Sequence, residues 1–83
     1  VCTPPDSHEE ITTALARRGV HVLCEKPFAM TPASARRMAA AAEQAGVLLT
    51  MGSKFRYVED VIKARSLVAS GVIGEVVLFE NAF

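Results

Sequence analysis

Three short polar segments, at residues 3–8, 25–29 and 52–57, each follow an apolar run and carry the side chains best suited to chemistry. Glu25 and Lys26 stand out because charges at the end of an apolar run are costly unless they are paired or used. A positioned lysine can orient a polar substrate and exchange a proton with it. A Glu–Lys pair facing solvent at the edge of a sheet explains the same two residues equally well, so both alternatives stay open.

The other two segments offer contacts to anions and to polar groups. Residues 3–8 (TPPDSH) lead into a predicted helix, whose free N–H groups can hold an anion or a ribose hydroxyl. The local sequence favours the simpler interpretation of a rigid loop with a helix cap, and His8 could face solvent as easily as contact a ligand. In the third segment, Lys54 and Arg56 could bind an anionic or polar substrate group, with ion pairing to the two acidic residues that follow as the competing interpretation.

Alternating strands and helices must position these segments. Short apolar runs bounded by turn residues predict strands over residues 1–2, 20–24, 47–51 and 74–83. Apolar spacing and stop glycines predict three helices, between Ser7 and Gly19, between Thr31 and Gly46, and from Val58 to Ser70. This alternation predicts an α/β fold with a parallel sheet. Ligands bind such sheets at the carboxyl ends of the strands, where all three polar segments are expected.

Helix starts and buried faces can be predicted in more detail. Ser7 and Glu10 have the spacing of a capping box, and Thr31 followed by Pro32 indicates a second cap. The buried face of the first helix is predicted to consist of Ile11, Ala14 and Leu15. That of the second is predicted to consist of Ala35, Met38, Ala39 and Ala42.

Composition excludes several classes of protein. The 83 residues contain nine Lys plus Arg and nine Asp plus Glu, and this neutrality without a basic block argues against nucleic-acid and membrane-surface partners. The longest strictly apolar stretch, Met38 to Ala42, is too short to span a bilayer. Cys2 and Cys24 lie in strand-like segments, which predicts reduced thiols in a cytoplasmic protein. Together with His8 and His21 they lack the spacing of metal ligands, so no metal site is expected.

Three motifs occur in order along the chain: TPPDSH at residues 3–8, GVHVLCEKP at residues 19–27 and GVIGEV at residues 71–76. Together they resemble the glucose–fructose oxidoreductase / inositol dehydrogenase / MocA family of NAD(P)-dependent oxidoreductases. The resemblance covers essentially all 83 residues, but only the middle of a family chain. It implies the C-terminal part of a Rossmann-type NAD(P)-binding domain over residues 1–70. Residues 71–83 would begin the second, substrate-binding domain with its first strand.

The resemblance also implies a role for each matched residue. Lys26 would be the catalytic residue, beside the nicotinamide and the reacting carbinol. The peptide bond between Lys26 and Pro27 would be cis. The remaining matched residues would contact NAD or NADP, with His8 near its ribose side: Thr3, Pro4, Pro5, His8, Glu25 and Pro27. Lys54 and Arg56 would join Lys26 in contacting the substrate, although family members often have Asn in place of Lys54.

The function implied for the parent protein is hydride transfer between a nicotinamide cofactor and a sugar, cyclitol or related secondary alcohol. The glycine-rich fingerprint for the pyrophosphate would precede Val1, and the Asp and His that supply the general base would follow Phe83. The isolated 83 residues are therefore expected to be inactive, and the parent is expected to be a homo-oligomer. The alternative is a non-catalytic regulator of the same fold that binds a sugar or a nucleotide, in which that Asp and His are replaced.

Overall fold

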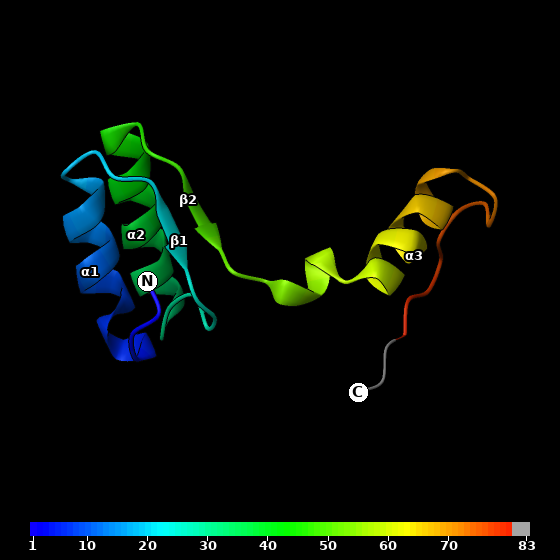
Figure 1. Cartoon of the computed structure of the whole chain (residues 1–83), viewed down its shortest axis with the longest axis horizontal. Helices are drawn as coiled ribbons and strands as arrows, with labels where there is room; N and C mark the ends of the chain where they lie inside the picture. The colour runs from blue at the N-terminus through cyan, green and yellow to red at the C-terminus, as the bar shows by residue number, and fades with distance from the viewer. Residues whose placement is uncertain (81–83) are drawn as a thin grey trace. The chain divides into compact units, whose positions relative to one another are not determined.

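A computed structural model describes residues 1–80 of the chain (Figure 1). The chain divides between Ser53 and Lys54 into two compact units, of which the first ends at Ser53 and the second begins at Lys54. No helix in residues 1–80 has both the length and the apolar character needed to cross a membrane. The elements, in chain order, are the 3₁₀ turn η1 (Pro5–Ser7), α1 (His8–Ala16), β1 (Val22–Cys24), α2 (Pro32–Ala45), β2 (Leu49–Met51), the 3₁₀ turn η2 (Lys54–Tyr57) and α3 (Glu59–Ala69).

Strands β1 and β2 pair in parallel, with Leu23 opposite Thr50, which confirms the predicted α/β class. On the other side of β1, the Val1 nitrogen donates to the Leu23 carbonyl oxygen at 2.6 Å. The Glu25 N–H donates to the Val1 carbonyl oxygen at 2.9 Å. These are the bonds of a parallel ladder, so Val1 behaves as a neighbouring strand although residues 1–2 are not assigned as one.

Both strands begin two residues later than predicted because the helices before them end with an extra turn. The Val20 N–H donates back to the Leu15 carbonyl oxygen at 3.1 Å, and the Val47 N–H donates back to the Ala42 carbonyl oxygen at 3.0 Å. Val20 and Val47 therefore complete helix ends rather than strand pairs. Gly19 and Gly46 lie at these ends with positive φ, of 74° and 65°, as predicted for stop glycines.

The core lies between the sheet and the two helices α1 and α2. Val22 and Cys24, on one face of β1, pack with Met38 of α2, and all three are buried. The predicted face of α2 is confirmed at Met38 and Ala42, whereas Ala35 is half-buried and Ala39 is exposed.

The predicted face of α1 is wrong. Its fully buried side chains are His8, Thr12 and Ala16, one every four residues. The predicted residues Ile11, Ala14 and Leu15 are half-buried, although Leu15 does pack on the core. The apolar pattern failed here because two of the three residues that face the core are polar.

Only one of the two predicted helix caps forms. Thr31 Oγ1 accepts a hydrogen bond of 3.1 Å from the Ser34 N–H, and Pro32 begins α2, as predicted. The capping box at Ser7 is wrong, because η1 leads directly into α1 and leaves Ser7 in a helical conformation. A side-chain cap requires an extended residue there. The Ser7 hydroxyl lies instead 2.7 Å from the Pro4 carbonyl oxygen and 2.8 Å from Thr3 Oγ1.

The second unit contains η2 and α3. Helix α3 covers most of the predicted helix from Val58 to Ser70 and none of its residues is buried. The strand predicted over residues 74–83 is absent from residues 74–80, which pair with no strand of the described part of the chain. Residues 81–83 lie outside the described residues. The domain boundary predicted after residue 70 stays a prediction.

Candidate active site at the carboxyl ends of the strands

The second and third polar segments begin where β1 and β2 end. The Gly52 N–H donates to the Cys24 carbonyl oxygen at 2.8 Å, which extends the ladder one residue beyond β2. A Cβ atom on Gly52 would lie 3.7 Å from that oxygen and 3.9 Å from the Glu25 carboxyl group. Glu25 therefore lies beside the start of the third segment. The sequence analysis did not predict that Gly52 and Glu25 lie close together. The signal that could have indicated it is a glycine placed directly after a strand.

The loop after β1 consists of Glu25, Lys26 and Pro27, and the Lys26 ammonium in it has no partner within residues 1–80. The Glu25 carboxylate accepts a hydrogen bond of 2.5 Å from the backbone N–H of Lys26, and the Lys26–Pro27 peptide bond is cis, as predicted. Lys26 is exposed, and its ammonium has no hydrogen-bond or ion-pair partner within residues 1–80. The Glu–Lys ion pair considered from the sequence is therefore not formed. The ammonium can bind an acceptor from outside the chain.

His8 connects the first segment to this loop, because its ring contacts a backbone oxygen of each. Its side chain is fully buried, so the alternative of a solvent-facing histidine is wrong. Nε2 lies 2.9 Å from the Thr3 carbonyl oxygen, and Nδ1 lies 3.1 Å from the Pro27 carbonyl oxygen. Thr3 and Pro4 are exposed, and Pro5 is half-buried. The structure thus brings Thr3, His8 and Pro27 together.

Lys54 and Arg56 belong to the second unit. Both are exposed on η2, and Lys54 Nζ lies 5.3 Å from the centroid of the Phe55 ring, within range of a cation–π interaction. The ion pair within residues 1–80 is that of Glu9 and Arg37, so neither cation pairs with the acidic residues that follow it. Their contact with a substrate stays a prediction. Residues 1–80 contain no group of three or more His, Cys, Asp or Glu that could hold a metal ion.

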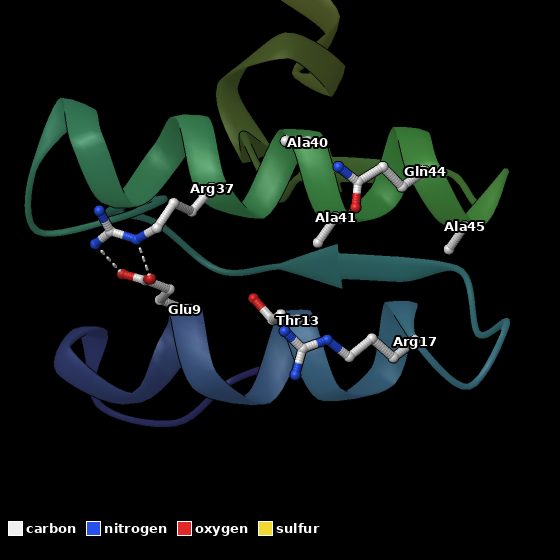
Figure 2. A pocket seen from close by; sticks show the side chains of 8 residues that line it. All are labelled: Glu9, Thr13, Arg17, Arg37, Ala40, Ala41, Gln44 and Ala45. Atoms are coloured by element: carbon white, nitrogen blue, oxygen red, sulfur yellow. Dashed lines mark hydrogen bonds and ion pairs between the residues drawn. The ribbon is translucent and has the colours of Figure 1, made fainter.

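The strongest electrostatic interaction lies away from these loops, on the outer side of α1 and α2 (Figure 2). Arg37 donates to the Glu9 carboxylate through Nε at 2.5 Å and through Nη2 at 2.8 Å. The Arg37 guanidinium, followed by the Ser34 hydroxyl, lowers the pKa of Glu9 to about 2, and the same pair raises the pKa of Arg37. The pair flanks a groove of about 550 Å³, which no residue of the three polar segments lines.

Comparisons with known proteins agree with one another. Residues 1–53 match the family described as "Oxidoreductase family, NAD-binding Rossmann fold". The chain is 41% identical over 76 residues to D-glucoside 3-dehydrogenase of Escherichia coli strain K12, covering 92% of this chain and 22% of the relative. It is 45% identical over 74 residues to 1,5-anhydro-D-fructose reductase of Ensifer adhaerens, covering 89% of this chain and 22% of the relative.

A solved structure has the same arrangement. The oxidoreductase of Agrobacterium radiobacter, in complex with NAD⁺, L-tartaric acid and magnesium, superimposes with a TM-score of 0.86 at 30% identity. The match covers 89% of this chain and 22% of that one. The chain thus spans between a fifth and a quarter of the length of these proteins. By sequence and by fold, it belongs to the Gfo/Idh/MocA family of NAD-binding Rossmann-fold oxidoreductases.

Proposed function

We propose that the protein containing this chain is an NAD(P)-dependent oxidoreductase that acts on a sugar, cyclitol or related secondary alcohol. The observation that carries the proposal is the exposed Lys26 ammonium, which has no partner within residues 1–80 and lies on the loop that directly follows β1. Family membership and the sugar-acting enzymes among the relatives support the reaction class.

The residues of the loops suit a nicotinamide dinucleotide. The Thr3 hydroxyl and the Glu25 carboxylate can accept hydrogen bonds from ribose hydroxyls, and both residues are exposed. Pro4 and Pro27 are also exposed and offer rigid apolar surface beside these polar groups. We assign these four residues, with Pro5, to the cofactor side of the site. Substrate contacts are assigned to Lys26, Lys54 and Arg56.

The cofactor supplies the nicotinamide ring that accepts or returns the hydride. The role of the chain is to orient the reacting groups and to manage the proton. Lys26 donates a hydrogen bond to the oxygen of the reacting carbon and helps to relay its proton. Glu25 accepts from the Lys26 N–H, and this bond fixes the backbone that carries the ammonium.

The decisive experiment compares Lys26→Ala with the matched control Lys63→Ala in the full-length protein, since Lys63 is exposed on α3. A panel of sugars and cyclitols is assayed with NAD⁺ and NADP⁺ by the absorbance of the reduced nicotinamide. Lys26→Ala should lower kcat by orders of magnitude and leave cofactor affinity largely unchanged. An unchanged kcat would contradict the assignment. Tight cofactor binding with no turnover on any substrate would favour a non-catalytic regulator.

Two further proposals concern assembly. The parallel strands of this chain need neighbours on both sides, so the isolated 83 residues should bind NAD(H) and NADP(H) no more tightly than about 1 mM. A titration that gave clearly tighter binding would contradict this. The full-length protein is expected to be a homo-oligomer, which sedimentation analysis would test.

A further inference from the structure

His8 is a fully buried polar residue that the proposed reaction does not use directly. Both of its ring nitrogens lie within hydrogen-bond distance of a backbone carbonyl oxygen, Nε2 of Thr3 and Nδ1 of Pro27. A carbonyl oxygen only accepts hydrogen bonds, so each contact requires a proton on the ring nitrogen. An imidazole protonated on both nitrogens makes both bonds together, and a neutral ring makes one of them.

The neighbouring thiol does not need to compete for Nδ1. Cys24 Sγ lies 3.3 Å from Nδ1 and is also within reach of the Glu25 carbonyl oxygen, at 3.6 Å. A thiol has one proton to donate. When it donates to Glu25, Nδ1–H remains available for the Pro27 carbonyl oxygen.

The bond to Pro27 holds the far side of the Lys26 loop. Before Lys26, the loop is held by the ladder, through the Glu25 N–H to Val1 and through the Gly52 N–H to the Cys24 carbonyl oxygen. Pro27 has no N–H of its own, so its carbonyl is its only backbone hydrogen-bonding group. His8 Nδ1 lies 3.1 Å from that oxygen. Lys26 therefore lies between one anchor made by the sheet and one made by His8.

We propose that His8 is a positioning residue, whose Nδ1–H bond to the Pro27 carbonyl oxygen holds the loop in the conformation that presents the Lys26 ammonium to the substrate. The inference rests on the proposed function, in which Lys26 contacts the reacting oxygen. This positioning role replaces the contact with the cofactor ribose that was expected of His8. A fully buried ring acts through the loop atoms that it contacts, here the carbonyl oxygens of Thr3 and Pro27. The contact of His8 Nε2 with the Thr3 carbonyl oxygen holds the first segment and not the Lys26 loop.

Two substitutions separate the two bonds. The amide nitrogen of Asn takes the place of Nδ1, and that of Gln takes the place of Nε2. His8→Asn therefore keeps the bond to Pro27, and His8→Gln keeps the bond to Thr3. In the full-length protein, His8→Gln should lower kcat by on the order of 10- to 100-fold, with NAD(H) affinity changed little. His8→Asn should keep kcat within a few-fold. His21→Gln is the matched control, because His21 is exposed and its ring accepts from Leu48 N–H.

The outcomes distinguish this inference from the proposed function. If Lys26→Ala loses turnover and His8→Gln, corrected for its folded fraction, does not, the inference about His8 fails alone. Equal loss in His8→Asn and His8→Gln, in proportion to lost folded protein, would indicate a merely structural role and also overturn it. Full activity of Lys26→Ala would overturn the proposed function itself.

A measurement on the unmodified protein covers the case in which both His8 variants fail to fold. Nitrogen-15 NMR of the histidine-labelled full-length protein reports which ring nitrogens of His8 carry a proton. A protonated Nδ1 is the expected result. An unprotonated Nδ1 would exclude the bond to Pro27 and overturn the inference.

Discussion

The sulfur of Cys24 lies 3.3 Å from Nδ1 of His8, and both side chains are fully buried beneath the loops that follow the strands. This contact joins β1 to the first turn of α1. It also places the thiol out of reach of solvent, whereas Cys2 is exposed.

Cys24 should resist thiol reagents in the folded protein, because modification requires access to the sulfur. With a small alkylating reagent and peptide mass spectrometry, Cys2 should be modified rapidly and Cys24 only after denaturant is added. The control Cys2→Ser should lack the rapid modification. Modification of Cys24 at the rate of Cys2 under native conditions would contradict the described core.

Met38 is the largest of the fully buried side chains. Its truncation in Met38→Ala leaves a cavity between α2 and the sheet, which should lower the free energy of unfolding by about 2–5 kcal/mol. Denaturant unfolding followed by circular dichroism measures the change. The matched control is Met30→Ala, since Met30 is 65% exposed and should have little effect. Similar losses in the two variants would argue against the assignment of Met38 to the core.

The cap of α2 predicts a smaller effect. Thr31→Ala removes the acceptor of the Ser34 N–H and should destabilise the protein by about 1 kcal/mol. Thr31→Ser keeps a hydroxyl at the same place and should recover most of the loss. The comparison requires only thermal melts of the three proteins. Equal destabilisation by Ala and Ser would show that the hydroxyl bond is not the cause.

The ion pair of Glu9 and Arg37 predicts a dependence of stability on pH. The pKa of Glu9 in the folded state is about 2, below its ordinary value of 4.5, because Arg37 favours the carboxylate. The ion pair therefore contributes its full stabilisation at pH values above the ordinary pKa of Glu9. This stabilisation is lost as the pH falls from there through the pKa of the folded state. Both side chains reach solvent, so salt should weaken the effect.

Glu9→Gln tests this dependence. The variant should be less stable than the unmodified protein at neutral pH, and the difference should shrink through the acidic range and vanish near the folded pKa. Glu10→Gln is the control, since Glu10 is exposed and has no ion pair within residues 1–80. A difference that stayed constant down to the lowest pH would rule out the carboxylate as its origin.

The features that the sequence predicted correctly depend on near neighbours. Glycines stop helices by adopting positive φ, as Gly19, Gly46 and Gly71 do here, and Thr31 caps a residue three positions away. The parallel sheet and the position of Lys26 after β1 follow from the order of short apolar runs and helices. The candidate site at the carboxyl ends of the strands is predicted by the general rule that ligands bind there in parallel sheets.

The features that were missed depend on distant partners. His8 is buried because it meets Pro27, 19 residues away in the chain, and no local pattern reveals that contact. The cap expected at Ser7 failed because η1 had already made the chain helical. The strand expected from Gly74 onward needs a neighbour to pair with, and residues 74–80 have no strand partner within residues 1–80.

Strand β1 has hydrogen-bonded neighbours on both sides, Val1 on one and β2 on the other. The Val22 and Glu25 N–H groups, which donate to Leu48 and Val1, should therefore exchange with solvent only after the neighbour that accepts each bond has detached. The loop that carries Lys26 starts from this strand, and the contact of His8 with the Pro27 carbonyl oxygen lies at its other side. A ligand that enters or leaves can move the ammonium by rotation of the exposed Lys26 side chain, without shifting the strand from which the loop begins.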